Sequence, residues 1–297
     1  MTRIAVVGAN GMLGSDLVAA LRGLDTRLRR TRPAPTALET TPLTRADFDV
    51  TDAPAARKAL AGFDVIVNCT AWNRVDDAET MEAEAFAVNA DGPANLAAAA
   101  RATGARFIHI STDYVFDGTA TSPIPETTPR NPVSAYGRSK AAGEERALAG
   151  NPDATAVVRT AWLYGEHGLS FPGTMLRLAA ERDTVSVVTD QVGQPTWTGD
   201  LADQILRLID AGVPAGIYHG TNSGETSWYG FAREVFRLAD LDPDRVLPTD
   251  STAFSRPAPR PAYSVLGHDA WGRIGLEPMR PWQDALADAM ALGILGA

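Results

Sequence analysis

The chain has 297 residues, 45% of them hydrophobic and 21% charged, so it can bury a sizeable core and is expected to form one globular body of two closely packed parts. Its formal charge of −9 and pI near 5.0 argue against a sequence-independent nucleic-acid binder, which would need a surplus of Lys and Arg on one face. Cys69 is the only cysteine, so we expect no disulfide. No window approaches the roughly 20 apolar residues of a membrane span, and no signal-peptide pattern follows Met1. We therefore expect a cytoplasmic protein without membrane insertion.

The N-terminal half alternates strands with helices. Residues 3–7 predict a strand, followed by a glycine turn and a helix over 12–23 with apolar residues at helical spacing. The stretch 29–42 contains three prolines and predicts an exposed loop around a short or irregular second strand. By the right-handed crossover rule, the alternation predicts a parallel, doubly wound sheet. Its further elements are strands over 63–69, 106–110 and 156–159 and helices over 81–102 and 134–149.

Beyond residue 160 the alternation loosens, and neither a flexible linker nor an internal repeat separates the halves. The predicted elements there are helices over 174–181, 198–211 and 228–239, a strand over 185–188 and a Pro-rich loop over 256–261. The fold class is therefore α/β. We expect a Rossmann dinucleotide-binding domain over 1–160 and a smaller, interleaved substrate-binding part over 161–297, with segments around 190–222 returning to the Rossmann body.

A GxxGxxG pattern stands directly after the first strand and opens the first helix, which is the context that gives this motif meaning. Glycines let the backbone approach a pyrophosphate, which then lies at the positive end of the helix. The pattern predicts dinucleotide binding, although glycines also end strands without binding anything. The residues expected to contact the cofactor in this turn are Gly8, Asn10, Gly11, Met12, Leu13 and Gly14.

The end of the second strand bears on the choice of cofactor. Arg45 stands where an acid would bind a free ribose 2′-hydroxyl and could pair with a 2′-phosphate, which favours NADPH and leaves NADH open. Against this, Asp47 is close by, and Arg45 could be an ordinary solvated residue. Asp49 and Val50 are candidates for flanking the adenine, whereas Asp52 is expected to cap the next helix.

Tyr136 and Lys140 lie four residues apart in YGRSK and hence on one face of a predicted helix. A lysine ammonium near a phenol stabilises the phenolate, so the tyrosine pKa is expected to lie below its reference value of about 10. Upstream, an apolar strand runs into Ser111, Thr112 and Asp113, which places hydroxyls at its carboxyl end. Ligands bind at that edge of a doubly wound sheet, and a hydroxyl there can hold a substrate carbonyl.

The order of glycine turn, Ser/Thr at a strand end and YxxxK resembles the extended short-chain dehydrogenase/reductases. Within them, the chain resembles the dTDP-4-dehydrorhamnose reductases and related 4-ketoreductases of nucleotide-activated deoxysugars, over nearly its whole length. The segments that carry this resemblance are GANGMLG (8–14), DVIVNCTAWNRVDDAE (64–79), FAVNADGPANLA (86–97), HISTDYVFDG (109–118), YGRSKAAGE (136–144), RTAWLYG (159–165), DQVGQPTW (190–197) and YHGTNSGETSWYGFA (218–232).

The resemblance implies that Thr112, Tyr136 and Lys140 are the catalytic trio, with Tyr136 protonating the oxygen while NADPH delivers hydride to the sugar C4. Tyr136 and Lys140 would also contact the cofactor, Lys140 through the nicotinamide ribose. Asn89 looks like the family's structural asparagine and is placed with the cofactor-binding residues. Past the third strand, the residues expected to line the cofactor are Asn68, Thr70 and Ala71. Cys69 is placed with them, with a small packed apolar residue as the alternative.

On the substrate side, Trp162 matches the family's substrate-contacting tryptophan, and an aromatic face against a sugar ring is physically sensible, with core packing as the alternative. Arg256 and Arg260 could pair with the nucleotide diphosphate or be solvated surface residues. The other residues expected to bind substrate are Asp113, Tyr114 and Gln191. The chain departs from the usual family pattern around the sugar pocket at Trp72, Asn73 and Tyr263.

The resemblance implies NADPH-dependent reduction of the C4 keto group of dTDP-4-dehydro-6-deoxy-L-mannose to dTDP-L-rhamnose. Two alternatives stay open: a 4-ketoreductase for another dTDP-4-keto deoxyhexose of a specialised-metabolite pathway, and a non-catalytic NADP-binding regulatory subunit. A homodimer also stays open. No metal site is expected, because the four histidines lack metal-ligand spacing. The acid pairs Asp76–Asp77 and Glu144–Glu145 are expected to face solvent or a helix N-terminus.

Overall fold

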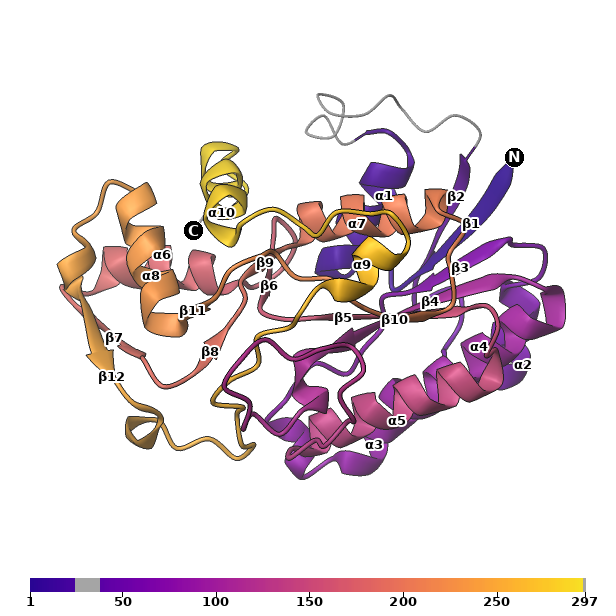
Figure 1. Cartoon of the computed structure of the whole chain (residues 1–297), viewed down its shortest axis with the longest axis horizontal. Helices are drawn as coiled ribbons and strands as arrows, with labels where there is room; N and C mark the ends of the chain where they lie inside the picture. The colour runs from indigo at the N-terminus through magenta and orange to yellow at the C-terminus, as the bar shows by residue number, and fades with distance from the viewer. Residues whose placement is uncertain (25–37, 296–297) are drawn as a thin grey trace.

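The computed structural model describes residues 1–24 and 38–295 and is centred on a six-stranded sheet with strand order β10-β5-β4-β3-β1-β2 (Figure 1). All its neighbouring strands are parallel, and the interior strands are buried on both faces, as a sheet covered by crossover helices requires. The predicted fold class is confirmed. The strands are β1 (Thr2–Val7), β2 (Leu38–Leu43), β3 (Val65–Asn68), β4 (Arg106–Thr112), β5 (Thr155–Thr160) and β10 (Gly216–His219).

Helices cover both faces of this sheet. On one face, α1 (Met12–Leu21) and α7 (Thr198–Asp210) lie side by side over a core that includes Leu17 and Ile205. The other face carries α2 (Ala53–Ala59), α4 (Gly92–Thr103) and α5 (Ala135–Gly150). Asp52 caps α2 by accepting a hydrogen bond from the Ala55 N–H at 3.0 Å, as predicted. Residues 29–37 of the predicted loop lie outside the described residues.

The long helix predicted over 81–102 is a helical run with a π turn inside it. It consists of α3 (Glu82–Phe86), the π turn (Ala87–Asp91) and α4. Such single π turns are frequent at functional sites. The turn buries Asn89 completely, and periodicity could not have predicted it, because one extra residue in a turn barely changes the apolar pattern.

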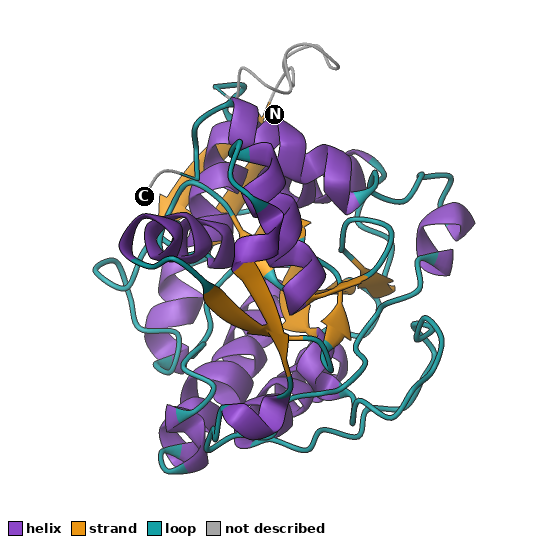
Figure 2. Cartoon of the chain, turned by 90° about the vertical axis from the view of Figure 1, so that its left-hand side faces the viewer, coloured by secondary structure: helices purple, strands orange, loops and turns teal. Residues whose placement is uncertain are grey.

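The chain beyond residue 160 contributes both to the sheet and to a second body. Figure 2, which looks onto the second body, shows strands running through the middle of the molecule with helices above and below. The segments α7 and β10 belong to the first body, which consists of the six-stranded sheet and its covering helices. β10 was not predicted, because its run of four residues is too short to show a period. The division into domains at residue 160 stays a prediction.

The second body has its own core, to which Phe231, Val235 and Trp282 belong. Several elements in this part of the chain were not predicted: β12 (Val246–Thr249), α10 (Trp282–Ala291), the strands of two residues and the short helix over 269–273. Within residues 1–24 and 38–295, no helix has the length and apolar character needed to cross a bilayer. The remaining elements are β6 (Leu163–Tyr164), α6 (Phe171–Glu181), β7 (Val185–Val188), β8 (Val192–Gly193), β9 (Thr196–Trp197), β11 (Thr226–Ser227), α8 (Trp228–Leu238), β12 (Val246–Thr249), α9 (Asp269–Arg273) and α10 (Trp282–Ala291).

Candidate active site

The turn after β1 has the shape of a phosphate-binding loop. Gly8 has a φ of +84°, a left-handed value that glycine adopts without strain, and a Cβ on Gly14 would lie 2.2 Å from the Gly8 carbonyl oxygen. Gly11, the N-cap of α1, has no side chain that could accept a hydrogen bond from the first turn. The N–H groups of that turn therefore stay available at the positive end of the helix. The turn therefore fits the pyrophosphate of a dinucleotide. Of the other residues predicted for this turn, Asn10 is exposed, Met12 is half-buried and Leu13 is buried.

The ends of β2 and β3 meet this turn. The Gly8 N–H donates to the carbonyl of Leu43, the last residue of β2, at 2.9 Å. A Cβ on Gly8 would lie 3.0 Å from Thr70 Cγ2, and the Thr70 hydroxyl donates to Asn68 Oδ1 at 2.6 Å. Cys69, which lies between Asn68 and Thr70 in the sequence, is half-buried. Desolvation raises the pKa of its thiol to about 12, so the thiol stays protonated. The structure thus brings the glycine turn and two predicted cofactor residues, Cys69 and Thr70, to one edge of the sheet.

The residues after β2 leave Arg45 at the surface. Its guanidinium lies 3.2 Å from the Asp49 carboxylate, with 90% of its side chain exposed. Asp47, the acid that could have bound a ribose hydroxyl, accepts hydrogen bonds from the Thr44 N–H at 2.8 Å and the Thr44 hydroxyl at 2.9 Å, which hold the pKa of its carboxyl below the usual range. Val50 is buried, and its carbonyl accepts from Asn95 at 3.0 Å. The acid is therefore engaged locally, and the arginine is the exposed charge at this strand end.

Asn89 supports the loop after β3. Its Oδ1 accepts from the Trp72 N–H at 2.8 Å, and its Nδ2 donates to the Trp72 carbonyl and the Ser139 hydroxyl, both at 3.0 Å. With 0% exposure and its amide filled, it presents no atom to a cofactor, so the prediction of direct contact is wrong. Its amide instead fixes the loop that carries the exposed Ala71.

The three predicted catalytic residues come from β4 and α5. Thr112 ends β4, where its hydroxyl donates to Asp113 Oδ1 at 3.0 Å and accepts from the Tyr114 N–H at 3.2 Å. Tyr136 is the second residue of α5, and its ring meets Tyr114 edge to face at 5.5 Å. One turn later, the buried Lys140 Nζ donates to the Ile110 carbonyl of β4 at 2.7 Å. The trio therefore gathers at the carboxyl edge of the sheet.

The trio's proton affinities differ from the sequence prediction. Desolvation raises the pKa of Tyr136 to about 12, and the Asp113 charge adds to the rise, while a hydrogen bond from Thr112 opposes it. The predicted lowering of the tyrosine pKa is therefore wrong, because burial outweighs any stabilisation of the phenolate. Desolvation also lowers the pKa of Lys140 to about 8. Near neutral pH the Tyr136 phenol is therefore a protonated donor, and the Lys140 side chain is charged.

A buried ion pair lies behind the trio. The Glu144 carboxylate accepts from Arg159 Nε and Nη2, both at 2.8 Å, and from the Ser111 hydroxyl at 2.6 Å. Glu144 and Arg159 are 0% and 1% exposed, so the expectation that Glu144 faces solvent is wrong. Glu144 connects the helical turn after Lys140 to Ser111, the residue before Thr112. Its position four residues after Lys140 could have indicated this, since it puts both on one helix face.

Trp162 follows β5 and lies against a second tryptophan. Its indole stacks on Trp228 with ring centroids 3.6 Å apart and planes at 10°, and Gly193 covers it from another side. The expectation that a face of this ring lies against a sugar is therefore wrong. Trp228 lies in the segment 218–232 that resembles the family, but nothing in the sequence indicated that it would contact Trp162.

Other residues predicted to bind substrate have protein partners. Asp113 is 2% exposed and holds the Thr112 hydroxyl, so it supports the threonine and offers no surface to substrate. Gln191 Nε2 donates to the Ser251 hydroxyl at 2.8 Å. Tyr114 is half-buried and contacts Tyr136, which places it beside the predicted proton donor.

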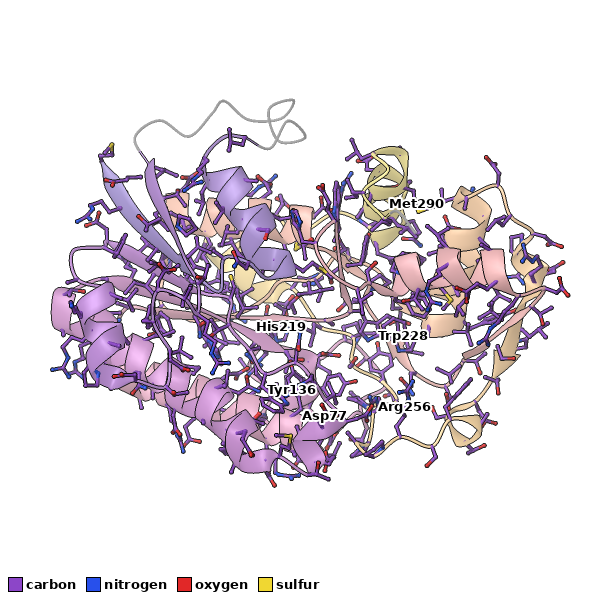
Figure 3. All side chains as sticks on the ribbon, turned by 180° about the vertical axis from the view of Figure 1, so that it is seen from behind. Asp77, Tyr136, His219, Trp228, Arg256 and Met290 are labelled. Atoms are coloured by element: carbon purple, nitrogen blue, oxygen red, sulfur yellow. The ribbon has the colours of Figure 1, made fainter. Side chains whose placement is uncertain are left out.

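The Pro-rich loop is fastened to the first body. Arg260 donates to both carboxylate oxygens of Asp76, at 2.6 and 2.9 Å, and the Ala258 N–H donates at 3.2 Å. These contacts keep the pKa of Asp76 low, and its side chain is 26% exposed, so the expected solvent exposure holds only in part. Arg256 lies 3.7 Å from the same carboxylate, with 62% of its side chain exposed. In Figure 3, Tyr136, Trp228 and Arg256 lie toward the middle of the molecule, where its two parts meet.

Two of the three departures from the family pattern, Trp72 and Tyr263, also have contacts in the structure. Trp72 packs in a small apolar cluster with Tyr136, and the Arg74 guanidinium lies 4.2 Å from its ring centroid. The Tyr263 hydroxyl donates to Glu225 at 2.8 Å, while Asn73 is exposed. Of the three, Trp72 is the one that packs against the same small apolar cluster as the predicted proton donor.

Known proteins match the chain along nearly its full length. A family model described as the RmlD substrate binding domain matches residues 1–293. A dTDP-4-keto-6-deoxy-D-glucose reductase from Streptomyces niveus is 47% identical over 292 residues, covering 98% of this chain and 97% of the relative. A dTDP-4-dehydrorhamnose reductase from Streptomyces griseus is 48% identical over 293 residues, covering 97% and 92%.

A solved structure agrees with these matches. The dTDP-4-dehydrorhamnose reductase of Bacillus anthracis, in complex with NADP, has a TM-score of 0.89 to this chain at 34% identity, covering 98% of this chain and 100% of the other. The similarity therefore extends over both bodies of the molecule.

Proposed function

Because the chain belongs to the RmlD substrate-binding-domain family, we propose that the protein is an oxidoreductase of deoxysugar biosynthesis that uses NADPH to reduce the C4 keto group of dTDP-4-dehydro-6-deoxy-L-mannose, giving dTDP-L-rhamnose. The observation that carries this proposal is the meeting of Thr112, Tyr136 and Lys140 with the glycine turn at one edge of the sheet. Relatives of the chain carry the names of such reductases.

The cofactor proposal rests on the strand ends. The glycine turn would hold the pyrophosphate, and Arg45 would leave its exposed pair with Asp49, which is worth at most about 1 kcal/mol, for the 2′-phosphate. The engaged carboxylate of Asp47 favours NADPH over NADH, since it is not free to bind a ribose hydroxyl. When bound, NADPH supplies the hydride.

The chain's own residues would hold the ketone and supply the proton. The Thr112 hydroxyl would turn from Asp113 Oδ1 to donate its hydrogen bond to the C4 oxygen, and the Tyr136 phenol would donate its proton to that oxygen. A phenol with a pKa of about 12 is fully protonated near neutrality, which suits a donor in the reductive direction. The Lys140 ammonium lies buried one turn away, where its positive charge would stabilise the phenolate that the transfer leaves.

A second candidate is a 4-ketoreductase for another dTDP-4-keto deoxyhexose. The Streptomyces niveus relative is named for 4-keto-6-deoxyglucose, and Trp72 packs against the same small apolar cluster as Tyr136. A large apolar side chain lining the sugar pocket would tolerate a sugar with fewer hydroxyls, because it leaves no polar partner of a missing hydroxyl unpaired.

A non-catalytic regulatory subunit is the weaker alternative. A protein that only binds the dinucleotide needs no proton donor, whereas this chain has a buried lysine, a tyrosine and a threonine at the carboxyl edge. We further propose that the protein acts in the cytoplasm on a small nucleotide sugar and on neither membrane nor nucleic acid; its net charge of −9 disfavours nucleic acid. Light scattering decides between a monomer and a homodimer.

The direct test is NADPH oxidation by the purified protein. The two sugars are dTDP-4-dehydrorhamnose generated in situ and dTDP-4-keto-6-deoxyglucose, with NADH in parallel reactions. Rapid oxidation with dehydrorhamnose alone supports the proposed reaction, and oxidation with only the other sugar selects the second candidate. NADPH binding without reduction of either sugar would overturn both and favour the regulatory subunit.

A further inference from the structure

Trp162 has an unusual backbone conformation at the edge of the sheet that carries the trio. It follows β5, whose last residue, Thr160, lies opposite Thr112 in the parallel register. Its φ is +45°, in the left-handed region that bulky residues rarely enter. Such a conformation persists only where the surroundings over-determine it. One restraint is the hydrogen bond from the Thr196 N–H to the Trp162 carbonyl at 3.2 Å.

The ring of Trp162 is held between two neighbours. Trp228 stacks on it at 3.6 Å with planes at 10°. A Cβ on Gly193 would lie 2.7, 2.8 and 2.9 Å from Cε2, Cζ2 and Nε1 of the indole, so no residue with a side chain fits there without moving the ring. Pairing of Gly193 with Thr226, two residues before Trp228, ties the two neighbours to each other.

Trp228 is itself anchored in the second body. It begins α8, whose N-cap Ser227 accepts from the Gly230 N–H. Its ring lies 4.6 Å from that of Phe171, which in turn stacks on Phe231 at 5.2 Å. A row of aromatic rings therefore connects the core of the second body to Trp162.

The contacts leave one group of Trp162 available. An indole N–H lies in the ring plane, so a stack on the faces does not block it. Trp162 is half-buried, and its Nε1 makes none of the hydrogen bonds found among residues 1–24 and 38–295. A donor held in this way beside the end of β4 is suited to an oxygen of a bound sugar.

We propose that Trp228 is a positioning residue for sugar recognition: its stack on Trp162, opposed by Gly193, holds that indole with its N–H directed to the substrate. The inference deepens the proposed function and rests on it, because it requires a sugar at the edge of the sheet next to Thr112. Trp228 acts through Trp162 and does not touch the reacting atoms.

The inference predicts a loss in KM without a loss in kcat. Trp228→Leu keeps an apolar side chain but removes the stack, so we expect KM for the sugar to rise about tenfold, with kcat and the NADPH Kd within about twofold of wild type. Trp228→Phe keeps an aromatic face and should restore most of the affinity. Gly193→Ala pushes the indole from the other side and should raise KM as well.

The experiment combines kinetics with circular dichroism of the stacked indoles. The stack should give a signal that both Trp228→Leu and Trp162→Phe remove. Met290→Ala is the control, because Met290 packs against the core of the second body but lies away from Trp228 (Figure 3); it should lower Tm and leave KM unchanged.

An unchanged KM in Trp228→Leu, or equal losses in KM, kcat and NADPH affinity, would overturn the inference while leaving the proposed function intact if wild type reduces the sugar. Failure of wild type to reduce either sugar would overturn the proposed function and this inference with it.

Discussion

The two sides of the candidate site are held together by different kinds of interaction. The side formed by the parallel sheet relies on backbone turns and buried polar contacts: Lys140 and Glu144 are each 2% exposed or less. The side formed by the second body relies on stacked rings and a partly exposed ion pair, Arg260 with Asp76. Chemistry common to a whole enzyme class requires the first side, whereas the second is free to vary with the sugar. The first should therefore respond to single changes much more strongly.

The largest effect is expected at the buried pair behind the trio. Glu144→Gln leaves the Arg159 guanidinium buried without a counter-charge, which should lower the free energy of unfolding by about 3–5 kcal/mol. Urea unfolding measures this change. Glu145→Gln, next in sequence but exposed, is the matched control and should change stability by no more than about 0.5 kcal/mol. Equal effects of the two changes would mean that the pair does not stabilise the sheet side.

The next effect is on the proton donor. Tyr136→Phe removes the hydroxyl and should lower kcat at least about tenfold, a barrier increase of about 1.4 kcal/mol or more, with NADPH affinity nearly unchanged. Stopped-flow oxidation and fluorescence titration measure the two quantities. In Tyr229→Phe, the lost hydroxyl contacts only Arg233 among the described residues, and turnover should stay normal. Wild-type turnover in Tyr136→Phe would remove this residue from the mechanism.

The pH dependence of turnover tests the buried lysine. Lys140 has a pKa of about 8 because burial disfavours its charged form, so the ammonium is present below that pH and lost above it. We expect kcat to fall as pH rises through about 8, and the remaining activity of Lys140→Met to show no such fall. An identical alkaline limb in the variant would assign the titration to another group.

The smallest effect is expected at the surface. Arg45→Ala removes an exposed cation and should weaken NADPH binding by up to about 1 kcal/mol more than NADH binding. Isothermal titration with both cofactors measures the difference, and Arg57→Ala, an exposed arginine on α2, should not produce it. Equal losses for both cofactors would contradict a contact with the 2′-phosphate.

The sequence predicted the sheet side well for a physical reason. A glycine turn after a strand and a tyrosine one helical turn from a lysine are local patterns, and parallel strands bring their carboxyl ends together. What local patterns cannot give is burial. The same Tyr136 and Lys140 were placed correctly, but the sign of the tyrosine pKa shift was wrong because desolvation depends on everything that packs around the phenol.

The contacts on the substrate side were not predicted, because they join distant segments. Arg260 meets Asp76 across most of the chain, and Trp162 meets Trp228 through the pairing of β8 with β11. Both strands of that pair have two residues, too few to show a period. The residue types in these segments were visible, but their partners follow only from the tertiary fold.

The central claim is that the sheet side directs hydride to the C4 carbonyl of a dTDP-keto-sugar. Turnover of dTDP-4-dehydrorhamnose with NADPH carrying deuterium at its transferable position, followed by NMR of the product, tests it most directly. If the sheet side directs hydride to C4, the product is dTDP-L-rhamnose with deuterium at C4. Deuterium at another carbon, or unlabelled sugar recovered from protein that binds NADPH, would contradict it.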